Sequence, residues 1–511
     1  MRIFLINPPT NYDDPYPWVE PLGIGYIAAA CRDAGHEVRI RDLCYTTMDA
    51  VSRVFGELDE FRPDLVGLTA MTENFKNGLE IARAVKSRYG CPVVFGGWHV
   101  SGEPQAVLDP AIDYVVRGEG EDTILELLEY LQDKGPALSE INGIAYKEGG
   151  VLRLTAPRTR IKKLARLPVP VREGLSLENY KYLMLFSQPI SRMRTLSVQA
   201  SRGCPYTCVF CQTPAVWSNV WTKRTASSVV DEIEELAERH AANTFVFRDE
   251  EFTVRPNWVV ELCEEMIRRG IPRRLSWGAF VRVDDAVPEM VKAMKAAGCS
   301  YVLMGIEVSD EEQAKKIKKF YKREEAERAF RLYYNADIFA QGSWVVGFPW
   351  DTLESLERSF EWILTLEMDS LTMAFATPFA ATPLREYVDR HGLLLTQDTN
   401  AFTLHEPVIR TPEIPLETLR KLPAWYRRRF YFRPAQMARL ARKIVRDPRR
   451  VRIVAELLYD RVFKAKLFSY MSPDRRRRDW TFKVPGQYFE PLKQVAAPTG
   501  DSTTGPRALA V

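Results

Sequence analysis

Two successive runs of alternating apolar strands and amphipathic helices constrain the fold of this chain more than any other feature of its sequence. The first run extends from residue 1 to about residue 131 and includes the strand-like segments RIFLIN, HEVRIRDL, DLVGLTAM and PVVFGG. A strand–helix order of this kind predicts a parallel, doubly wound sheet with helices on both faces. Ligands of such sheets bind beyond the carboxyl ends of the strands, which here carry the segments NPPT, TAMTEN, GGWHVSGEP and RGEGE.

The second run begins near residue 194 with TLSVQAS, and its last strand is SLTMAFATPF. Six apolar segments, each followed by a helical stretch, favour a partial or full (β/α) barrel whose active site lies at the carboxyl ends of its strands. Between the two runs, INGIAYKEGGVLRL predicts a β-hairpin and LARLPVPVREGL predicts a proline-rich connector.

We therefore predict an α/β fold with a doubly wound, Rossmann-like N-terminal domain, a partial (β/α)6 barrel and a helical C-terminal region. The predicted parts are a sheet domain at 1–140, a hairpin and linker at 141–193, a barrel at 194–395, a basic helical domain at 396–494 and a disordered tail at 495–511.

Composition and charge exclude several classes of protein. The formal net charge of the 511 residues is only +4, so no overall field favours nucleic acid. No apolar stretch reaches the roughly 18–20 residues of a membrane span, and any membrane contact would be peripheral. The N-terminal MRIFLINPP is too short an apolar run for a signal peptide, so we expect a cytoplasmic protein whose eight cysteines form no disulfides.

The strongest chemical signal is SRGCPYTCVFC, which places Cys204, Cys208 and Cys211 on a loop that leaves the first strand of the second run. Thiolates suit soft iron, and three ligands this close in sequence can hold three corners of an iron–sulfur cluster while leaving one iron open. The alternative is a zinc site. A structural zinc site needs four protein ligands, and no fourth Cys or His lies nearby.

This C-x3-C-x2-C pattern, preceded by SRG and with an aromatic residue before its last cysteine, resembles the signature of the radical S-adenosylmethionine (SAM) superfamily. The resemblance implies that the three cysteines hold a [4Fe-4S] cluster. It also implies that the open iron binds the amino and carboxylate groups of SAM, which is cleaved to methionine and a 5′-deoxyadenosyl radical. Phe210 matches the aromatic residue that packs near the adenine.

Further strand ends fit the same barrel. The resemblance implies contacts from FRDEEF to the methionine amino group and from the carboxylate of MGIEVSD to the SAM ribose. An arginine in WGAFVRVD is a plausible partner for a carboxylate of SAM or substrate, and a glycine in WVVGFP allows close backbone approach. TPFAATPL departs from the commoner family pattern, which leaves a contact from the sixth strand unassigned. The residues concerned are Asp249, Glu250, Glu251, Arg282, Glu307 and Gly347.

The N-terminal sheet, joined to such a barrel, resembles the cobalamin-binding domain of cobalamin-dependent radical SAM enzymes, and the two resemblances cover about four-fifths of the chain. The family's D-x-H-x-x-G loop is absent, so we predict no cobalt coordination by histidine. For His99 a hydrogen bond to the nucleotide tail or to backbone is expected instead. The resemblance places one loop against the lower face of cobalamin, namely Thr69, Ala70, Met71 and Thr72. It places two segments along the nucleotide tail, namely Gly96 with Gly97 and Gly118 with Glu119.

The chain after residue 401 is strongly basic, with Arg427, Arg428, Arg429 and Arg433 interleaved with Phe430, Tyr431 and Phe432. These residues either form solvated helix faces, or close the active site over an anionic or hydrophobic substrate, or touch a membrane surface.

The predicted function is methylation of an unactivated carbon of a small-molecule, lipid-like or natural-product intermediate, with SAM, a [4Fe-4S] cluster and cobalamin as cofactors. Such chemistry needs an electron donor such as flavodoxin or ferredoxin. An oxidative cyclase or ring-contracting enzyme with the same cofactors is the alternative, and a cobalamin-binding sensor with a degenerate barrel is a third hypothesis. Neither the substrate nor a catalytic residue can be named, because barrel interiors carry no transferable code.

Overall fold

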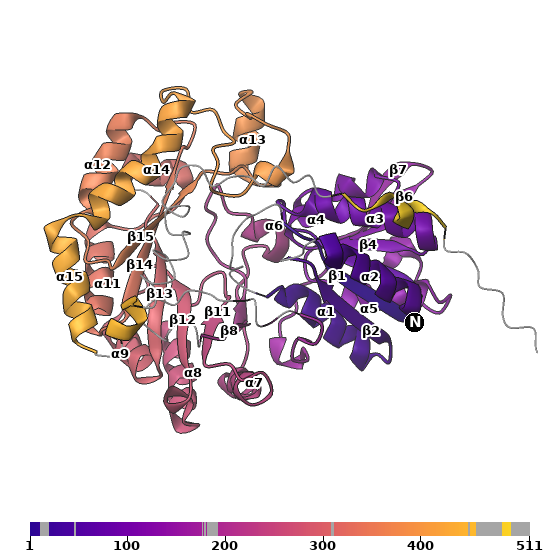
Figure 1. The fold of residues 1–511 in the computed structure, drawn as a ribbon, viewed down its shortest axis with the longest axis horizontal. Coiled ribbons are helices and arrows are strands. Elements are labelled where there is room, and N and C mark those ends of the chain that lie inside the picture. Colours follow the sequence, from indigo (N-terminus) through magenta and orange to yellow (C-terminus); the bar gives the residue numbers. More distant parts are fainter. Residues whose placement is uncertain are drawn as a thin grey trace, which may run out of the picture.

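The computed structural model describes residues 1–10, 20–44, 48–175, 177, 180, 193–307, 311–447, 450–455 and 483–491. Two lobes lie side by side, with the N-terminal sheet in one and the barrel in the other (Figure 1). The predicted disordered tail at 495–511 lies outside the described residues. In the described part of the chain, no helix is both long enough and apolar enough to cross a membrane.

The first lobe is built on a seven-stranded sheet in the order β2-β1-β3-β4-β5-β6-β7. Strands β1 to β5 are parallel, as the strand–helix pattern predicts, whereas β6 and β7 are antiparallel and extend the sheet at its edge. The hairpin predicted at the start of the linker is therefore part of the first sheet. The strands are β1 (Arg2–Asn7), β2 (Glu37–Asp42), β3 (Leu65–Thr69), β4 (Val93–Gly96), β5 (Tyr114–Val116), β6 (Ile144–Glu148) and β7 (Val151–Leu154).

Helices cover both faces of this sheet (Figure 1). Apolar residues of α1 and α5 form a core with one face, while α2 and α3 bury theirs against the other, which is the doubly wound arrangement. The helices of this lobe and its linker are α1 (Leu22–Asp33), α2 (Met48–Phe61), α3 (Phe75–Tyr89), α4 (Trp98–Gly102), η1 (Pro104–Leu108), α5 (Glu121–Tyr130), η2 (Leu138–Glu140) and η3 (Leu164–Arg166).

The second lobe is an open barrel of six parallel strands in the order β15-β14-β13-β12-β11-β8, which confirms the partial barrel. Its strands are β8 (Thr195–Val198), β11 (Thr244–Phe247), β12 (Ser276–Val281), β13 (Cys299–Gly305), β14 (Phe339–Val346) and β15 (Ser370–Phe375). A short antiparallel pair, β9 (Ser201–Arg202) and β10 (Thr222–Lys223), extends beyond β8.

Amphipathic helices surround the barrel. In α7, Thr225 caps the first turn by accepting a hydrogen bond from the amide of Ser228, and Val229, Ile233 and Leu236 recur at helical spacing on the buried face. The helices are α6 (Thr213–Trp217), α7 (Ala226–Arg239), α8 (Pro256–Arg268), η6 (Ile271–Arg273), α9 (Pro288–Ala296), α10 (Glu311–Ile317), α11 (Arg323–Asn335), α12 (Leu353–Ile363), α13 (Pro383–Arg390), η7 (Thr399–Ala401), α14 (Leu416–Tyr431) and α15 (Pro434–Val445).

The basic C-terminal helices α14 and α15 pack on the outside of the barrel. Arg429 pairs with Glu357 and Glu361 of α12. The Tyr431 hydroxyl hydrogen-bonds with Ser370, the first residue of β15, at 2.8 Å, and Arg433 donates to the carbonyl of Leu364 just before that strand. These side chains therefore anchor the helices near the amino end of β15 and do not cover the carboxyl ends of the strands.

The last described segment returns to the first lobe. The turn η8 (Gly486–Phe489) lies against α2 and α3, where Tyr488 stacks on Phe55 with ring centroids 4.5 Å apart. This segment was predicted to belong with the basic helices, but its packing places it with the N-terminal sheet.

The open edge of the barrel at β8 is covered by the first lobe and the linker. The buried carboxylate of Glu20 accepts hydrogen bonds from the amide of Ser197 at 2.6 Å and from its hydroxyl at 2.9 Å. Arg172 donates to the carbonyl of Ser197 at 2.8 Å and to Glu232 of α7 at 2.8 Å. The outward amide and carbonyl of Ser197 in this edge strand are thus satisfied by side chains from outside the barrel strands.

Candidate functional site

The three clustered cysteines lie on the loop at residues 203–211, beyond the carboxyl end of β8. The loop is fixed from two sides, because Val209 donates to the carbonyl of Ile317 at 3.0 Å and accepts from the amide of Leu384 at 2.9 Å. All three thiols are half-buried. They are therefore held in a defined conformation while remaining accessible.

Burial and mutual proximity act together on these thiols. The pKa of Cys204 is raised to about 12, mainly by burial, and the neighbouring Cys211 and Cys208 contribute to this rise. The pKa of Cys208 is also raised by burial, against the opposing charges of Lys319 and Arg282. A bound metal would reverse this balance, since coordination favours the thiolate.

The described residues contain no group of three or more His, Cys, Asp or Glu side chains that converge on a single metal ion. A cluster of several irons is bound at separate corners, so its thiolates need not meet at one point. The spacing on this loop is compatible with such a cluster.

Charged groups from three other strand ends gather around the cysteine loop. Glu307, which follows β13, has one carboxylate oxygen 3.1 Å from the Lys319 ammonium group, while its other oxygen is buried and lacks a hydrogen-bond partner within the described structure. Arg282, which follows β12, lies over the ring of Tyr206 with its guanidinium carbon 3.6 Å from the centroid and is held by Asp284 at 2.8 Å. An unpaired buried carboxylate oxygen is costly, so this site is suited to a polar ligand.

The three acidic residues after β11 have different roles. Asp249 accepts from the amide of Ala200 at 3.1 Å and from the Ser201 hydroxyl, and Glu250 accepts from the amide of Gly203 at 2.9 Å. These two carboxylates therefore fasten the backbone that leads into the cysteine loop. Glu251 accepts a hydrogen bond from the Thr253 hydroxyl at 2.6 Å, and its charge contributes to the raised pKa of Cys204.

Phe210 of the cysteine loop lies near the end of β14, where Phe348 follows Gly347. The ring of Phe210 lies 5.9 Å from that of Phe348. Gly347 has a positive φ of +84° and donates its amide to Asp351 at 2.8 Å, a turn that favours glycine. Burial raises the pKa of Asp351 to about 7.

In the first lobe, the predicted cobalamin residues lie together at the carboxyl edge of the sheet. His99 is buried, with its Nδ1 3.3 Å from the Thr72 hydroxyl and its ring 4.3 Å from that of Phe75. Its Nδ1 thus lies within hydrogen-bonding distance of a side-chain hydroxyl, and the expected contact of His99 to the nucleotide tail stays a prediction. Burial lowers its pKa to about 4, so the imidazole is neutral at pH 7.

The glycines at this edge differ in their surroundings. A Cβ atom on Gly97, whose φ is +105°, would lie 2.8 Å from the carbonyl of Ala70, so the close approach is between two loops of the protein. A Cβ atom on Gly96 would meet nothing nearer than the carbonyl of Val116 at 3.9 Å. Met71 is 45% exposed at the same edge. Open space here is therefore next to Gly96 and Met71.

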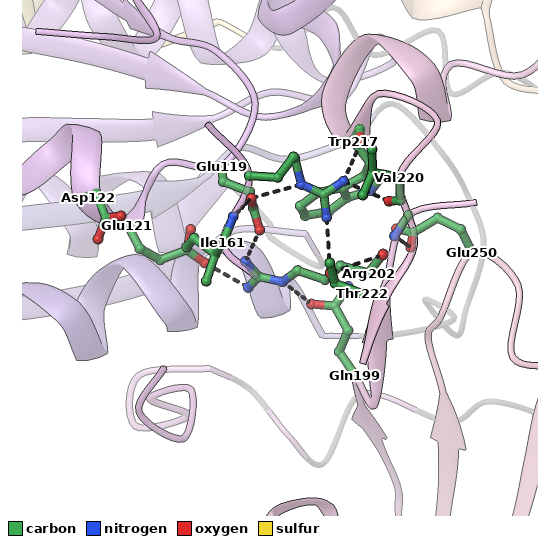
Figure 2. Close-up of polar contacts among 12 residues, drawn as sticks. Glu119, Glu121, Asp122, Ile161, Gln199, Arg202, Trp217, Val220, Thr222 and Glu250 are labelled. Atoms are coloured by element: carbon green, nitrogen blue, oxygen red, sulfur yellow. Dashed lines mark hydrogen bonds and ion pairs between the residues drawn. The ribbon is translucent and has the colours of Figure 1, made fainter. Parts of the chain in front are cut away.

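Gly118 and Glu119 face the barrel. A Cβ atom on Gly118 would lie 3.3 Å from the carbonyl of Val216 in α6. The buried carboxylate of Glu119 accepts from Arg160 at 2.8 Å and from Arg202 at 3.1 Å, and Figure 2 shows this network between the lobes. The acidic residue predicted beside the nucleotide tail is thus engaged by two arginines.

Comparison with known proteins identifies the two lobes. The family model of the B12 binding domain matches residues 15–128, and that of the radical SAM superfamily matches residues 198–363. An uncharacterized methyltransferase of Pyrococcus horikoshii is 31% identical over 443 residues, which cover 85% of this chain and 93% of its own. The chain belongs to the cobalamin-dependent radical SAM family.

This family includes enzymes other than methyltransferases. An anaerobic magnesium-protoporphyrin IX monomethyl ester cyclase of Cereibacter sphaeroides is 29% identical over 75% of this chain, which spans 63% of the cyclase. A solved structure of the radical SAM methyltransferase TsrM of Kitasatospora setae, with tryptophan and a SAM analogue bound, has a TM-score of 0.65 at 22% identity over 77% of each chain. At that identity the likeness establishes the fold.

As a cobalamin-dependent radical SAM protein, the chain is an enzyme whose cofactors are a [4Fe-4S] cluster, SAM and cobalamin. The barrel residues fit the first two, since three thiols and the unpaired buried oxygen of Glu307 follow the carboxyl ends of β8 and β13 in the same barrel. The carboxyl edge of the first sheet, with Met71 exposed and Gly96 open, faces the barrel and can receive the third.

Two residues near the thiols were missed by sequence reasoning. Lys319 pairs with Glu307 and influences Cys208, and Tyr206 stacks under Arg282. Tyr206 lies within the cysteine motif and could have been noted there. Lys319 lies in a Lys-rich stretch where no spacing separates it from its neighbours.

Proposed function

We propose that this enzyme methylates an unactivated carbon of a small-molecule, lipid-like or natural-product intermediate. The observation that carries the proposal is the 31% identity to a methyltransferase over 93% of that protein's length. The carboxyl edge of the first sheet also faces the cysteine loop, which would bring a methyl carrier and a radical source to the same substrate. When bound, the cofactors supply a radical that removes a hydrogen atom and the methyl group that replaces it.

In this proposal the chain's own residues bind and orient the reacting groups. Cys204, Cys208 and Cys211 would hold the cluster. The unpaired oxygen of Glu307 would accept from a SAM hydroxyl group, and Arg282 would face a carboxylate, although Asp284 already engages it. Glu251 would lie near the SAM amino group.

The remaining predicted residues are proposed to act less directly. Asp249 and Glu250 would keep the cysteine loop in place, and Phe210 would flank the adenine. On the first lobe, Thr69, Met71 and Gly96 would contact cobalamin, with Ala70, Thr72, Gly97, His99 and Gly118 shaping the loops behind them. We propose no histidine ligand to cobalt, because His99 is buried against Thr72 and Phe75.

The test is anaerobic reconstitution with iron, sulfide and reduced cobalamin, followed by SAM carrying a labelled methyl group. Transfer of label to cobalamin is expected if the enzyme is a methyltransferase. Formation of 5′-deoxyadenosine without labelled methylcobalamin would contradict methyl transfer. That second result would favour oxidative cyclisation or ring contraction, for which the 29% identity to a cyclase is the supporting observation.

We propose further that the enzyme acts in the cytoplasm and receives electrons from flavodoxin or ferredoxin, since cleavage of SAM consumes one electron. Mixing each reduced donor with the reconstituted enzyme and SAM tests this, and deoxyadenosine should form with at least one donor.

The outer surface of α14 and α15 is proposed to make peripheral membrane contact. Trp425, Phe432, Met437 and Val445 are between 46% and 76% exposed, and exposed arginines, Arg428, Arg442 and Arg446, accompany them. Apolar side chains flanked by cations suit an anionic membrane surface. Co-sedimentation with vesicles containing phosphatidylglycerol should be lost in Phe432→Glu, and equal binding of both proteins would contradict the proposal.

A further inference from the structure

The cysteine loop is fixed to the first lobe at both of its ends. Arg202 lies two positions before Cys204, and Gln212 follows Cys211 directly. Each makes a contact across the boundary between the lobes, buried for Arg202 and partly buried for Gln212, so the loop that carries the thiols is flanked by two such contacts. Figure 2 shows the first of them.

Arg202 is held by two carboxylates of the first lobe. Its guanidinium group donates to Glu119 at 3.1 Å and to Glu121 at 2.7 Å, and its side chain is 4% exposed. The same group lies over the ring of Tyr26, 4.8 Å from its centroid. The planar fork of an arginine fixes direction as well as distance when it binds two carboxylates.

A second arginine strengthens this contact. Arg160, from the linker, donates to Glu119 at 2.8 Å and to the carbonyl of Val220 at 2.9 Å. One carboxylate is thus shared by arginines from the linker and the barrel. The two arginines balance the charges of the two glutamates. One oxygen of Glu121 has no hydrogen-bond partner within the described structure.

At the other end of the loop, the side-chain amide of Gln212 donates to the carbonyl of Trp98 at 3.0 Å and to that of Ala380 at 3.2 Å. Trp98 begins α4, directly after Gly97, and Ala380 follows β15. This contact joins the end of the cysteine loop to the edge of the first sheet where cobalamin is proposed to bind.

We infer that Arg202 and Gln212 are positioning residues that set the distance and orientation between the cysteine loop and the carboxyl edge of the first sheet. Because both bracket the thiols and neither contacts them, their role is to fix where the radical source lies relative to the cobalamin edge. This inference rests on the proposed function only in requiring both cofactors in one molecule.

The experiment measures the magnetic interaction between the reduced cluster and cob(II)alamin in the full-length, doubly loaded enzyme without substrate. Both centres are paramagnetic, so electron paramagnetic resonance reports their separation. The native enzyme should give a single, well-defined interaction. Arg202→Gln should give a weaker or broadly distributed one with both cofactors still bound, and Arg202→Lys should restore it in part.

If Arg202→Gln fails to take up its cluster, Glu121→Gln and Gln212→Leu replace it in the same measurement. Both variants leave the sequence from Arg202 to Cys211 unchanged. Lys443→Gln is the matched control, because it breaks a buried pair with Asp369 at the other end of the barrel and should leave the interaction native. An unchanged interaction in the loaded Arg202, Glu121 and Gln212 variants overturns the inference, as does an equal change in the control. Label transfer from SAM is measured separately, so failure of methyl transfer would not be mistaken for failure of this inference.

Discussion

The cysteine loop and the carboxyl edge of the first sheet are both predicted cofactor sites, but their side chains are satisfied to different degrees. Near the cysteine loop, Glu307 retains a buried carboxylate oxygen without a partner in the described structure. At the sheet edge, His99 is paired with Thr72, and Glu119 is paired with Arg160 and Arg202. The barrel site keeps a carboxylate oxygen available for a polar ligand, whereas His99 and Glu119 at the sheet edge already have partners within the protein.

This difference shows how each site is expected to recognise its ligand. Iron and SAM require ligand atoms of a given type at fixed positions, so specific side chains are held in place to bind them. A large cofactor can instead be received by backbone and by the shape of loops. Substitutions should therefore act through chemistry in the barrel and through loop conformation in the sheet.

The substitution Cys208→Ala is expected to produce the largest difference in effect between the two sites. It should reduce cluster iron to background and abolish deoxyadenosine formation, because three thiolates are needed to hold the cluster. Binding of cobalamin should remain native. Iron analysis and cobalamin absorbance measure the two effects, and persistent deoxyadenosine would disprove the cluster assignment.

Glu307→Gln should weaken SAM binding by about 10- to 100-fold, the effect of removing one charged hydrogen bond. Equilibrium binding of SAM to the reconstituted enzyme measures it. Glu354→Gln, which changes an exposed carboxylate paired with Arg358, is the control and should bind SAM normally. Equal affinity in Glu307→Gln and the native enzyme would remove this residue from the SAM site.

Two adjacent glycines test whether the sheet edge works through backbone. Gly97→Ala should destabilise the first lobe by about 1–3 kcal/mol, because its φ is positive and the new Cβ would lie 2.8 Å from the carbonyl of Ala70. Gly96→Ala should leave the stability within about 1 kcal/mol of native, since its Cβ enters open space. Thermal unfolding and cobalamin retention distinguish them, and native retention by Gly96→Val would place cobalamin elsewhere.

The last prediction concerns the pH dependence of stability, which develops only below about pH 6.5 and is absent at neutral pH. Burial lowers the pKa of His99 from 6.5 to about 4, so the unfolded chain binds the extra proton first as pH falls. The folded state should therefore lose up to about 3 kcal/mol between pH 6.5 and pH 4. The positive charge of Arg385 lowers the pKa of His99 in the same direction. Unfolding followed against pH should show a shallower slope in His99→Gln, and identical slopes would contradict a buried neutral histidine.

Sequence patterns predicted the two sheets and the cysteine loop because each depends on residues close in the chain. Apolar alternation fixed the strands of both lobes, and three closely spaced cysteines defined the cluster loop. The pairing of Glu119 with Arg202 could not be predicted, since 83 residues separate them and no local pattern relates them. The same holds for Tyr488, whose partner Phe55 lies in the first lobe. Such contacts depend on the shapes and charges of the surfaces that the folded segments present to one another.

The cover that Glu20 and Arg172 place over β8 has a consequence for the independence of the two lobes. A fragment beginning at residue 194 would expose the polar ladder of that strand, and such ladders recruit strands from other molecules. The barrel is thus expected to aggregate when expressed alone. We therefore do not expect the two lobes to fold as independent modules. Exchange of one lobe for that of a relative would also require transfer of the residues that contact Ser197.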